Sequence, residues 1–194
     1  MVMVLVKKRL NNKYKKMKLI QIKDKKFRKF ISAEEIDQAI SKVAEQINHD
    51  YKDDAPVLLI TLNGAIIFGA DLLKKLTIDC TISCIKISSY AGIESTEQMN
   101  SLIGINEDLS GKRVIIVEDI VDTGNTYEHI VAELEGHNVK DVRMATMTFK
   151  PEAYKKELPI HYIGISIPRL FVVGRGLDYD GLGRNLNDIY QLAE

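Results

Sequence analysis

The sequence lacks tryptophan, has only two cysteines and four prolines, and contains no long apolar run. A membrane-spanning helix needs about 20 apolar residues, and the first six residues have neither the length nor the cleavage site of a secretory signal. Cys80 and Cys84 stand in a run that is typical of a strand, too far apart along it to form a disulfide, and the four histidines show no metal-ligand spacing. We therefore expect a cytoplasmic protein with buried free thiols and no Cys/His metal site.

The sequence also has no excess of charge of either sign, because 27 basic residues balance 27 acidic ones. This balance argues against nucleic acid or a membrane as a partner of the whole molecule. The charges are unevenly distributed, since residues 1–30 contain twelve Lys or Arg and a single acid, Asp24. We interpret residues 1–16 as a basic, disordered leader. Residues 17–194 are long enough for one good core but not for two, and are expected to form a single domain.

Removal of the leader tests this interpretation. Residues 1–16 show neither a core-facing period nor a motif, so a variant that begins at Met17 is expected to fold and to retain most of its activity. The measurements are the melting temperature and the activity of the shortened chain. Loss of solubility or a large drop in melting temperature would show that the leader is an integrated arm.

Apolar periodicity indicates an α/β fold. Ser32 and Glu35 form a capping box ahead of an amphipathic helix that we expect to end near Asp50. Beyond it, short apolar runs alternate with helical patterns that begin after Gly64 and after Gly124. The apolar runs are 57–62, 80–87, 114–117, 142–148 and 162–165.

Such uniformly apolar runs suit parallel strands that are covered on both faces. The predicted fold is therefore a doubly wound α/β domain, with a mainly parallel sheet flanked by helices. Two segments, 88–108 and 168–190, fit neither pattern and are rich in polar residues. We expect them to be irregular functional loops.

The most informative stretch reads Val-Ile-Ile-Val-Glu-Asp-Ile-Val-Asp-Thr-Gly-Asn-Thr. Ligands of open α/β sheets bind beyond the carboxyl ends of the strands, where Glu118 and Asp119 are expected. The turn has the chemistry of a phosphate cradle, because Gly124 lets the backbone approach closely and Thr123 and Thr126 supply hydroxyls beside a helix N-terminus. The two acids suit sugar hydroxyls or a cation instead. A ribose 5-phosphate group satisfies both ends of this stretch.

This stretch resembles the phosphoribosyl pyrophosphate signature of the type I phosphoribosyltransferases, and no Gly-Lys-[Ser/Thr] of a P-loop follows it. The resemblance implies Mg²⁺ as cofactor, with Glu118, Asp119 and Asp178 as its expected protein ligands. It also implies that Asp122 is the catalytic general base, placed near N7 of the incoming purine. The residues expected to bind phosphoribosyl pyrophosphate are Glu118, Asp119, Asp122, Thr123, Gly124, Asn125 and Thr126.

Two loops resemble further parts of that family. Asn63 and Gly64 correspond to the pyrophosphate-binding loop, although Asn63 replaces the commoner lysine. Ser89 and Tyr90 resemble the start of the mobile loop that closes over the reacting centre in the hypoxanthine-type enzymes. Closure of such a loop excludes water from a cation-like transition state.

The carboxyl-terminal third is similar to the purine-binding part of hypoxanthine-guanine members of the family. Lys150 matches the lysine that donates to the purine 6-oxo group, and Phe171 matches the aromatic residue that stacks on the base. The Val172 backbone is expected to face the Watson–Crick edge, Asp178 to hold Mg²⁺ through water, and Arg184 to reach pyrophosphate. The resemblance also implies a small hood built from the C-terminal segment and the N-terminal region.

The resemblance implies a purine salvage enzyme, a homodimer or homotetramer that transfers ribose 5-phosphate from phosphoribosyl pyrophosphate to hypoxanthine, and to guanine. Three alternatives stay open: a xanthine- or guanine-preferring enzyme, an RNA-binding regulator that keeps the fold, and a sugar-phosphate-binding protein without turnover. The acidic body of the chain and the retained Lys150, Phe171, Asp178 and Arg184 argue against the regulator.

Overall fold

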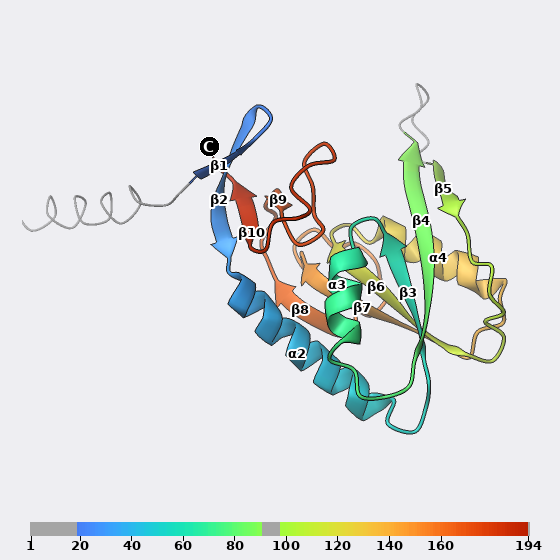
Figure 1. Ribbon diagram of the computed structural model, residues 1–194. Coiled ribbons are helices and arrows are strands. Elements are labelled where there is room, and N and C mark those ends of the chain that lie inside the picture. Colours follow the sequence, from blue (N-terminus) through green and yellow to red (C-terminus); the bar gives the residue numbers. More distant parts are fainter. Residues whose placement is uncertain (1–18, 91–97, 194) are drawn as a thin grey trace, which may run out of the picture.

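The computed structural model describes residues 19–90 and 98–193 (Figure 1). The expectation for the leader, residues 1–16, lies outside the described residues. Within the described parts of the chain, no helix is both long and apolar enough to cross a membrane. The elements are β1 (Leu19–Ile22), β2 (Lys25–Ile31), α2 (Ala33–Asp50), β3 (Val57–Leu62), α3 (Ile66–Leu73), β4 (Thr81–Tyr90), β5 (Gln98–Ile103), β6 (Arg113–Val121), α4 (Asn125–Glu135), β7 (Asp141–Phe149), β8 (Tyr162–Ser166), β9 (Val172–Val173) and β10 (Ile189–Leu192).

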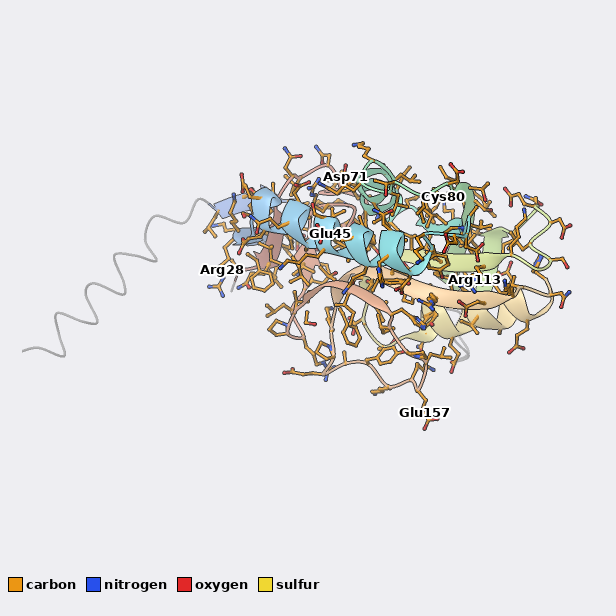
Figure 2. All side chains as sticks on the ribbon, turned by 90° about the horizontal axis from the view of Figure 1, so that it is seen from below. Arg28, Glu45, Asp71, Cys80, Arg113 and Glu157 are labelled. Atoms are coloured by element: carbon orange, nitrogen blue, oxygen red, sulfur yellow. The ribbon has the colours of Figure 1, made fainter. Side chains whose placement is uncertain are left out.

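The large sheet has the strand order β5-β4-β3-β6-β7-β8, and all of its pairs are parallel except β4 with β5. Successive residues of a strand point to opposite faces, so Leu58 and Ile60 pack with α2 and α3, whereas Val57 and Leu59 pack with α4. Figure 2 shows α2 on one side of the strands and α4 on the other. The predicted doubly wound α/β fold is confirmed.

Helix α2 forms where the capping box predicts it. The Ser32 hydroxyl accepts a hydrogen bond from the Glu35 N–H at 3.2 Å, and the Glu35 carboxylate accepts one from the Ser32 N–H at 2.9 Å. Its apolar side chains at helical spacing, Ile36 and Ile40 among them, are buried against the sheet. The helix ends at Asp50, as expected.

A second, antiparallel sheet has the order β1-β2-β10-β9 and joins the N-terminal region with the C-terminal segment, the two regions from which the hood was predicted. Its small core contains Ile22, Phe27 and Val173. Strands β1 and β2 were not foreseen, because Lys and Arg occupy most positions of β2 and hide its alternation. The last described residue, Ala193, lies beside this sheet, and its N–H donates to the Lys26 carbonyl at 2.8 Å. Figure 1 shows β10 next to β2.

The expectation that 88–108 and 168–190 are irregular is wrong in part. Strand β4 continues to Tyr90, and β5 pairs with it as an antiparallel edge strand. An edge strand needs no continuous apolar run, since it is not covered as the central strands are. Strand β9 and the start of β10 interrupt the second segment.

The cysteines also differ from expectation. Cys80 precedes β4 and only Cys84 lies in it; both thiols are free, but they are partly buried rather than buried.

Candidate active site

The two adjacent acids lie within strand β6 and not beyond it, which corrects the predicted strand end. In the parallel pairing of β6 with β7, Glu118 is the partner of Thr146, and the pairing continues until Val121 meets Phe149. The ladder fixes the backbone at these positions; the Glu118 side chain is buried and that of Asp119 is partly buried. Asp122 is the first residue after the strand.

Burial strongly perturbs this pair of carboxyl groups. Glu118 is 5% exposed, and its Oε1 accepts no hydrogen bond from the described residues. Burial, and then the neighbouring charge of Asp119, raise the pKa of Glu118 well above its usual range. Burial also raises the pKa of Asp119 to about 6, although the Ile120 N–H, which donates to Oδ1 at 2.9 Å, and the charge of Arg184 oppose this shift. Hydroxyl donors or a cation placed here would favour the ionised pair.

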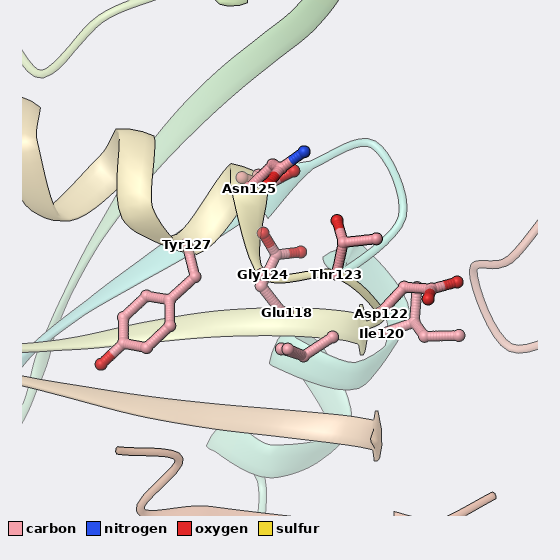
Figure 3. A pocket seen from close by; sticks show the side chains of 9 residues that line it. Glu118, Ile120, Asp122, Thr123, Gly124, Asn125 and Tyr127 are labelled. Atoms are coloured by element: carbon pink, nitrogen blue, oxygen red, sulfur yellow. The ribbon is translucent and has the colours of Figure 1, made fainter. Parts of the chain in front are cut away.

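The turn from Asp122 to Thr126, which is expected to bind phosphate and is here called the phosphate-like turn, lines a pocket of about 170 Å³ (Figure 3). Gly124 caps helix α4 with a φ of 89°, a left-handed conformation that favours glycine. A Cβ at this position would lie 2.5 Å from the Tyr154 ring and 2.7 Å from Lys156 Cγ, so space also demands glycine. The N-terminal N–H groups of α4 begin directly after this residue. The pocket is lined by Glu118, Ile120, Val121, Asp122, Thr123, Gly124, Asn125, Thr126 and Tyr127.

Asp122, the expected general base, forms an ion pair with Lys150, the expected hydrogen-bond donor to the purine. Lys150 Nζ lies 2.6 Å from Asp122 Oδ2, and the two side chains are 11% and 46% exposed. The backbone brings them together, because the Lys150 N–H donates to the carbonyl of Val121, immediately before Asp122, at 3.0 Å. A largely buried lysine side chain therefore faces a half-exposed carboxylate that lines the pocket.

The turn at Asn63 and Gly64, which is expected to bind pyrophosphate, meets the loop between β9 and β10 (residues 174–188, here called the hood loop) at two glycines. Gly64 follows β3 and lies against Asp119, since a Cβ on Gly64 would be 1.9 Å from Oδ2 of that carboxylate. A Cβ on Gly176 would in turn be 1.9 Å from the Gly64 carbonyl oxygen. Arg184 donates to Asp178 Oδ1 at 2.7 Å. The peptide bond between Leu62 and Asn63 is cis. The structure thus brings together most of the groups expected at the sugar, metal and pyrophosphate positions.

An aromatic cluster stands at the hood. Phe171 is 47% exposed, and its ring centroid lies 6.3 Å from that of Phe27 and 5.9 Å from that of Tyr179. The adjacent Val172 is 6% exposed and pairs with Gln191 of β10. Phe27 and Tyr179 were not foreseen as supports of Phe171, because Phe27 is far away in sequence and no regular spacing links Tyr179 to Phe171.

The expected mobile loop is described only at its start. Ser89 and Tyr90 end strand β4, where their backbones pair with Met99 and Gln98 of β5. Residues 91–97 lie outside the described residues.

Comparison with known proteins decides the family. Residues 32–180 match the phosphoribosyl transferase domain. The chain belongs to the phosphoribosyltransferase family. A hypoxanthine-guanine phosphoribosyltransferase of Staphylococcus epidermidis is 37% identical over 157 residues, which are 80% of this chain and 88% of that protein.

Solved structures of the same family superpose closely. A hypoxanthine-guanine phosphoribosyltransferase of Bacillus anthracis has a TM-score of 0.80 at 34% identity, covering 90% of this chain and 100% of the other. A hypoxanthine phosphoribosyl transferase of Trypanosoma cruzi has a TM-score of 0.81 at 30% identity, covering 90% and 95% of the two chains. This phosphoribosyltransferase therefore shares both sequence and fold with purine enzymes of the family.

The residues of this phosphoribosyltransferase fit Mg²⁺ only in part without substrate. Among residues 19–90 and 98–193, no three carboxylate, histidine or cysteine side chains gather into a metal-binding cluster. The unpartnered Oε1 of Glu118 and the carboxylate of Asp119 are nevertheless hard oxygen ligands of the kind that Mg²⁺ prefers. Because Mg²⁺ commonly uses one or two carboxylates together with substrate phosphates and water, this set suits a metal that arrives with a diphosphate.

The raised pKa of Asp119 predicts a pH-dependent stability. The folded phosphoribosyltransferase holds this proton more tightly than the unfolded chain, so the group's contribution to stability is full below about pH 4. It is lost as the pH rises through about 6. Asp119→Asn is expected to remove this loss, and its stability relative to the wild type should increase across that window.

Urea unfolding at a series of pH values, with a chelator to exclude cations, measures the effect. Asp53→Asn is the control, because the Asp53 side chain is 86% exposed. A difference between Asp119→Asn and wild type that stays constant from pH 4 to 6 would contradict the assignment.

Proposed function

We propose that this phosphoribosyltransferase is a purine salvage enzyme that converts hypoxanthine, and guanine, with phosphoribosyl pyrophosphate into the nucleoside 5′-monophosphate and pyrophosphate. The names of its relatives support this proposal. The observation that carries it is the Lys150–Asp122 ion pair, whose carboxylate lines the pocket at the phosphate-like turn. That pair places a hydrogen-bond donor and a base side by side where a purine would meet the ribose.

The ion pair matches the edge of a 6-oxopurine. An ammonium group has three N–H donors, and one of those of Lys150 points to Asp122. The purine oxygen at position 6 accepts a hydrogen bond from such a group, whereas the amino group of adenine offers a donor there. Exposed Phe171 supplies an aromatic face for the base.

In the proposed reaction, purine N9 forms a bond to C1′ of the ribose while the bond between C1′ and the pyrophosphate oxygen breaks. Pyrophosphate leaves with the electron pair, and Asp122 accepts the proton that the purine loses at N7. The ribose passes through a cation-like state, so the base need not be a strong nucleophile. Glu118 and Asp119 hold the ribose hydroxyls, and the turn from Thr123 to Thr126 holds the 5′-phosphate.

The reaction also requires that the negative charge of the leaving pyrophosphate be neutralised. Glu118, Asp119 and Asp178 are the proposed protein ligands of Mg²⁺, which when bound neutralises pyrophosphate charge. Arg184 and the backbone at Asn63 and Gly64 are the proposed pyrophosphate donors. A cytoplasmic location and a homodimeric or homotetrameric state stay predictions.

An initial-rate assay with phosphoribosyl pyrophosphate, Mg²⁺ and four bases tests the proposal. Hypoxanthine is expected to be converted and adenine is not. A mismatch of buried polar groups lowers kcat/KM for the wrong base by roughly 10⁴-fold or more. Guanine and xanthine assayed in parallel establish the preference at the purine 2-position. Comparable turnover of adenine would overturn the role of Lys150, and no turnover of any 6-oxopurine would overturn the enzyme assignment.

A further inference from the structure

The hood loop is in direct contact with the pyrophosphate turn. Gly176, with a φ of 104°, lies so close to the Gly64 carbonyl oxygen that a Cβ would be 1.9 Å from it. Gly64 lies equally close to the Asp119 carboxylate. These backbone segments leave no room between them, so a shift of the hood loop would also move the turn that is expected to bind pyrophosphate.

The residue before Gly176 ties this loop to the helix that continues the same turn. The Arg175 side chain is 16% exposed and lies 3.0 Å, from Nη1 to Oδ2, from Asp71 of helix α3. Helix α3 starts at Ile66, two residues after Gly64. The ion pair therefore links the two sides of the Gly64–Gly176 contact by a second route.

Arg175 is held in an unusual state for a surface loop. Its φ of 54° lies in the left-handed region that non-glycine residues seldom adopt. Its Nε is buried without a hydrogen-bond partner among the described residues, so the ion pair with Asp71 is the compensation that the structure provides for a largely buried guanidinium. Strain of this kind persists only where the surrounding structure enforces it.

The position of Arg184 depends on the same loop. Arg184 donates from Nη1 to the Gly176 carbonyl at 2.6 Å and from Nη2 to Asp178 at 2.7 Å, and its own carbonyl accepts from the Gly176 N–H at 3.0 Å. Arg184 is thus fixed to Gly176 at both its backbone and its side chain. Whatever places Gly176 also places this guanidinium.

We propose that Arg175 and Asp71 are positioning residues for the pyrophosphate end of phosphoribosyl pyrophosphate. This inference rests on the proposed function of the site. The pair holds Gly176 against Gly64, so that the turn and Arg184 converge on one diphosphate. It makes no contribution to the cradle at the 5′-phosphate, which belongs to helix α4.

Ligand binding separates this role from a purely structural one. Arg175→Met keeps an unbranched apolar stem and removes the charged guanidinium, and Asp71→Asn keeps the shape of the carboxylate. Each change is expected to weaken binding of pyrophosphate with Mg²⁺ roughly 10-fold by calorimetry, and to raise the KM for phosphoribosyl pyrophosphate by a similar factor. Affinity for inosine 5′-monophosphate, which lacks the diphosphate, and the KM for hypoxanthine are expected to change less than about two-fold. The double variant is expected to be no weaker than either single one, because both changes break one interaction.

Lys74→Met is the matched control. Lys74 pairs with the same carboxylate at 2.9 Å, but its side chain is 72% exposed, so its removal is expected to leave pyrophosphate affinity unchanged. Asp71→Asn carries the test even if Arg175→Met yields little folded protein.

Three results would overturn the inference: unchanged pyrophosphate affinity in the charge-removing variants, equal weakening of pyrophosphate and inosine 5′-monophosphate, or additive losses in the double variant. A wild-type protein that binds pyrophosphate but converts no 6-oxopurine would count against the proposed function alone. A wild-type protein that binds no pyrophosphate would overturn both.

Discussion

Asp122→Asn is expected to lower the turnover of hypoxanthine by roughly 10²- to 10⁴-fold, the range that general acid–base catalysis supplies. Asparagine keeps the size and an accepting oxygen for Lys150, which lies 2.6 Å from the carboxylate, but it cannot take up the purine proton. Affinity for phosphoribosyl pyrophosphate should change far less, because the proposed phosphate cradle consists of backbone and hydroxyl groups of the turn. Turnover is followed by ultraviolet absorbance and affinity by calorimetry.

Asp119→Asn provides the comparison for this prediction. Asp119 stands beside buried Glu118 in β6, so its change is expected to affect both binding and turnover. Near-native turnover in Asp122→Asn, or a loss of binding as severe as the loss of turnover, would contradict the general-base role.

Gly176→Ala is expected to destabilise the folded protein by roughly 3 kcal/mol or more, from overpacking together with backbone strain. The new methyl group would lie 1.9 Å from the backbone oxygen of Gly64, and the φ of 104° is unfavourable for alanine. Neither conflict is relieved by rotating a side chain. Urea unfolding monitored by circular dichroism measures the change in the free energy of unfolding.

Gly181→Ala isolates the close contact in that prediction. Gly181 lies in the same loop with a φ of 84°, but nothing lies within 4 Å of a Cβ built there. The decrease in the free energy of unfolding of Gly181→Ala should therefore reflect backbone strain alone, about 1–2 kcal/mol. Equal losses in the two variants would show that the contact between the loops yields without cost.

The central sheet and the phosphate-like turn were predictable because their information is local. Continuous apolar runs identify buried parallel strands, and the capping box at Ser32 identifies the start of α2 without any knowledge of the rest of the fold. Gly124 was predictable for the same reason, since the turn between strand and helix demands it. The actual end of β6 was not, because pairing with β7 rather than composition carries the strand through Glu118 and Asp119.

Contacts between distant segments were beyond reach of the sequence. The family resemblance gave Lys150 and Asp122 separate roles, yet nothing in the chain indicated that they form an ion pair. The close approach of Gly176 to Gly64 is invisible for the same reason, because a glycine in a polar loop has many uses. Such contacts depend on where the fold places two loops, which only the assembled structure reveals.

The second sheet has a consequence for the order in which the protein is made. Its central neighbours, β2 and β10, come from opposite ends of the chain, and β10 ends only at Leu192. On the ribosome, the segment that forms the pocket around Asp122 emerges long before β10 does. The proposed phosphate cradle can therefore form while the proposed stacking face around Phe171 still lacks its partner strand. We therefore expect a nascent chain to be able to bind a sugar phosphate before it can discriminate between purine bases.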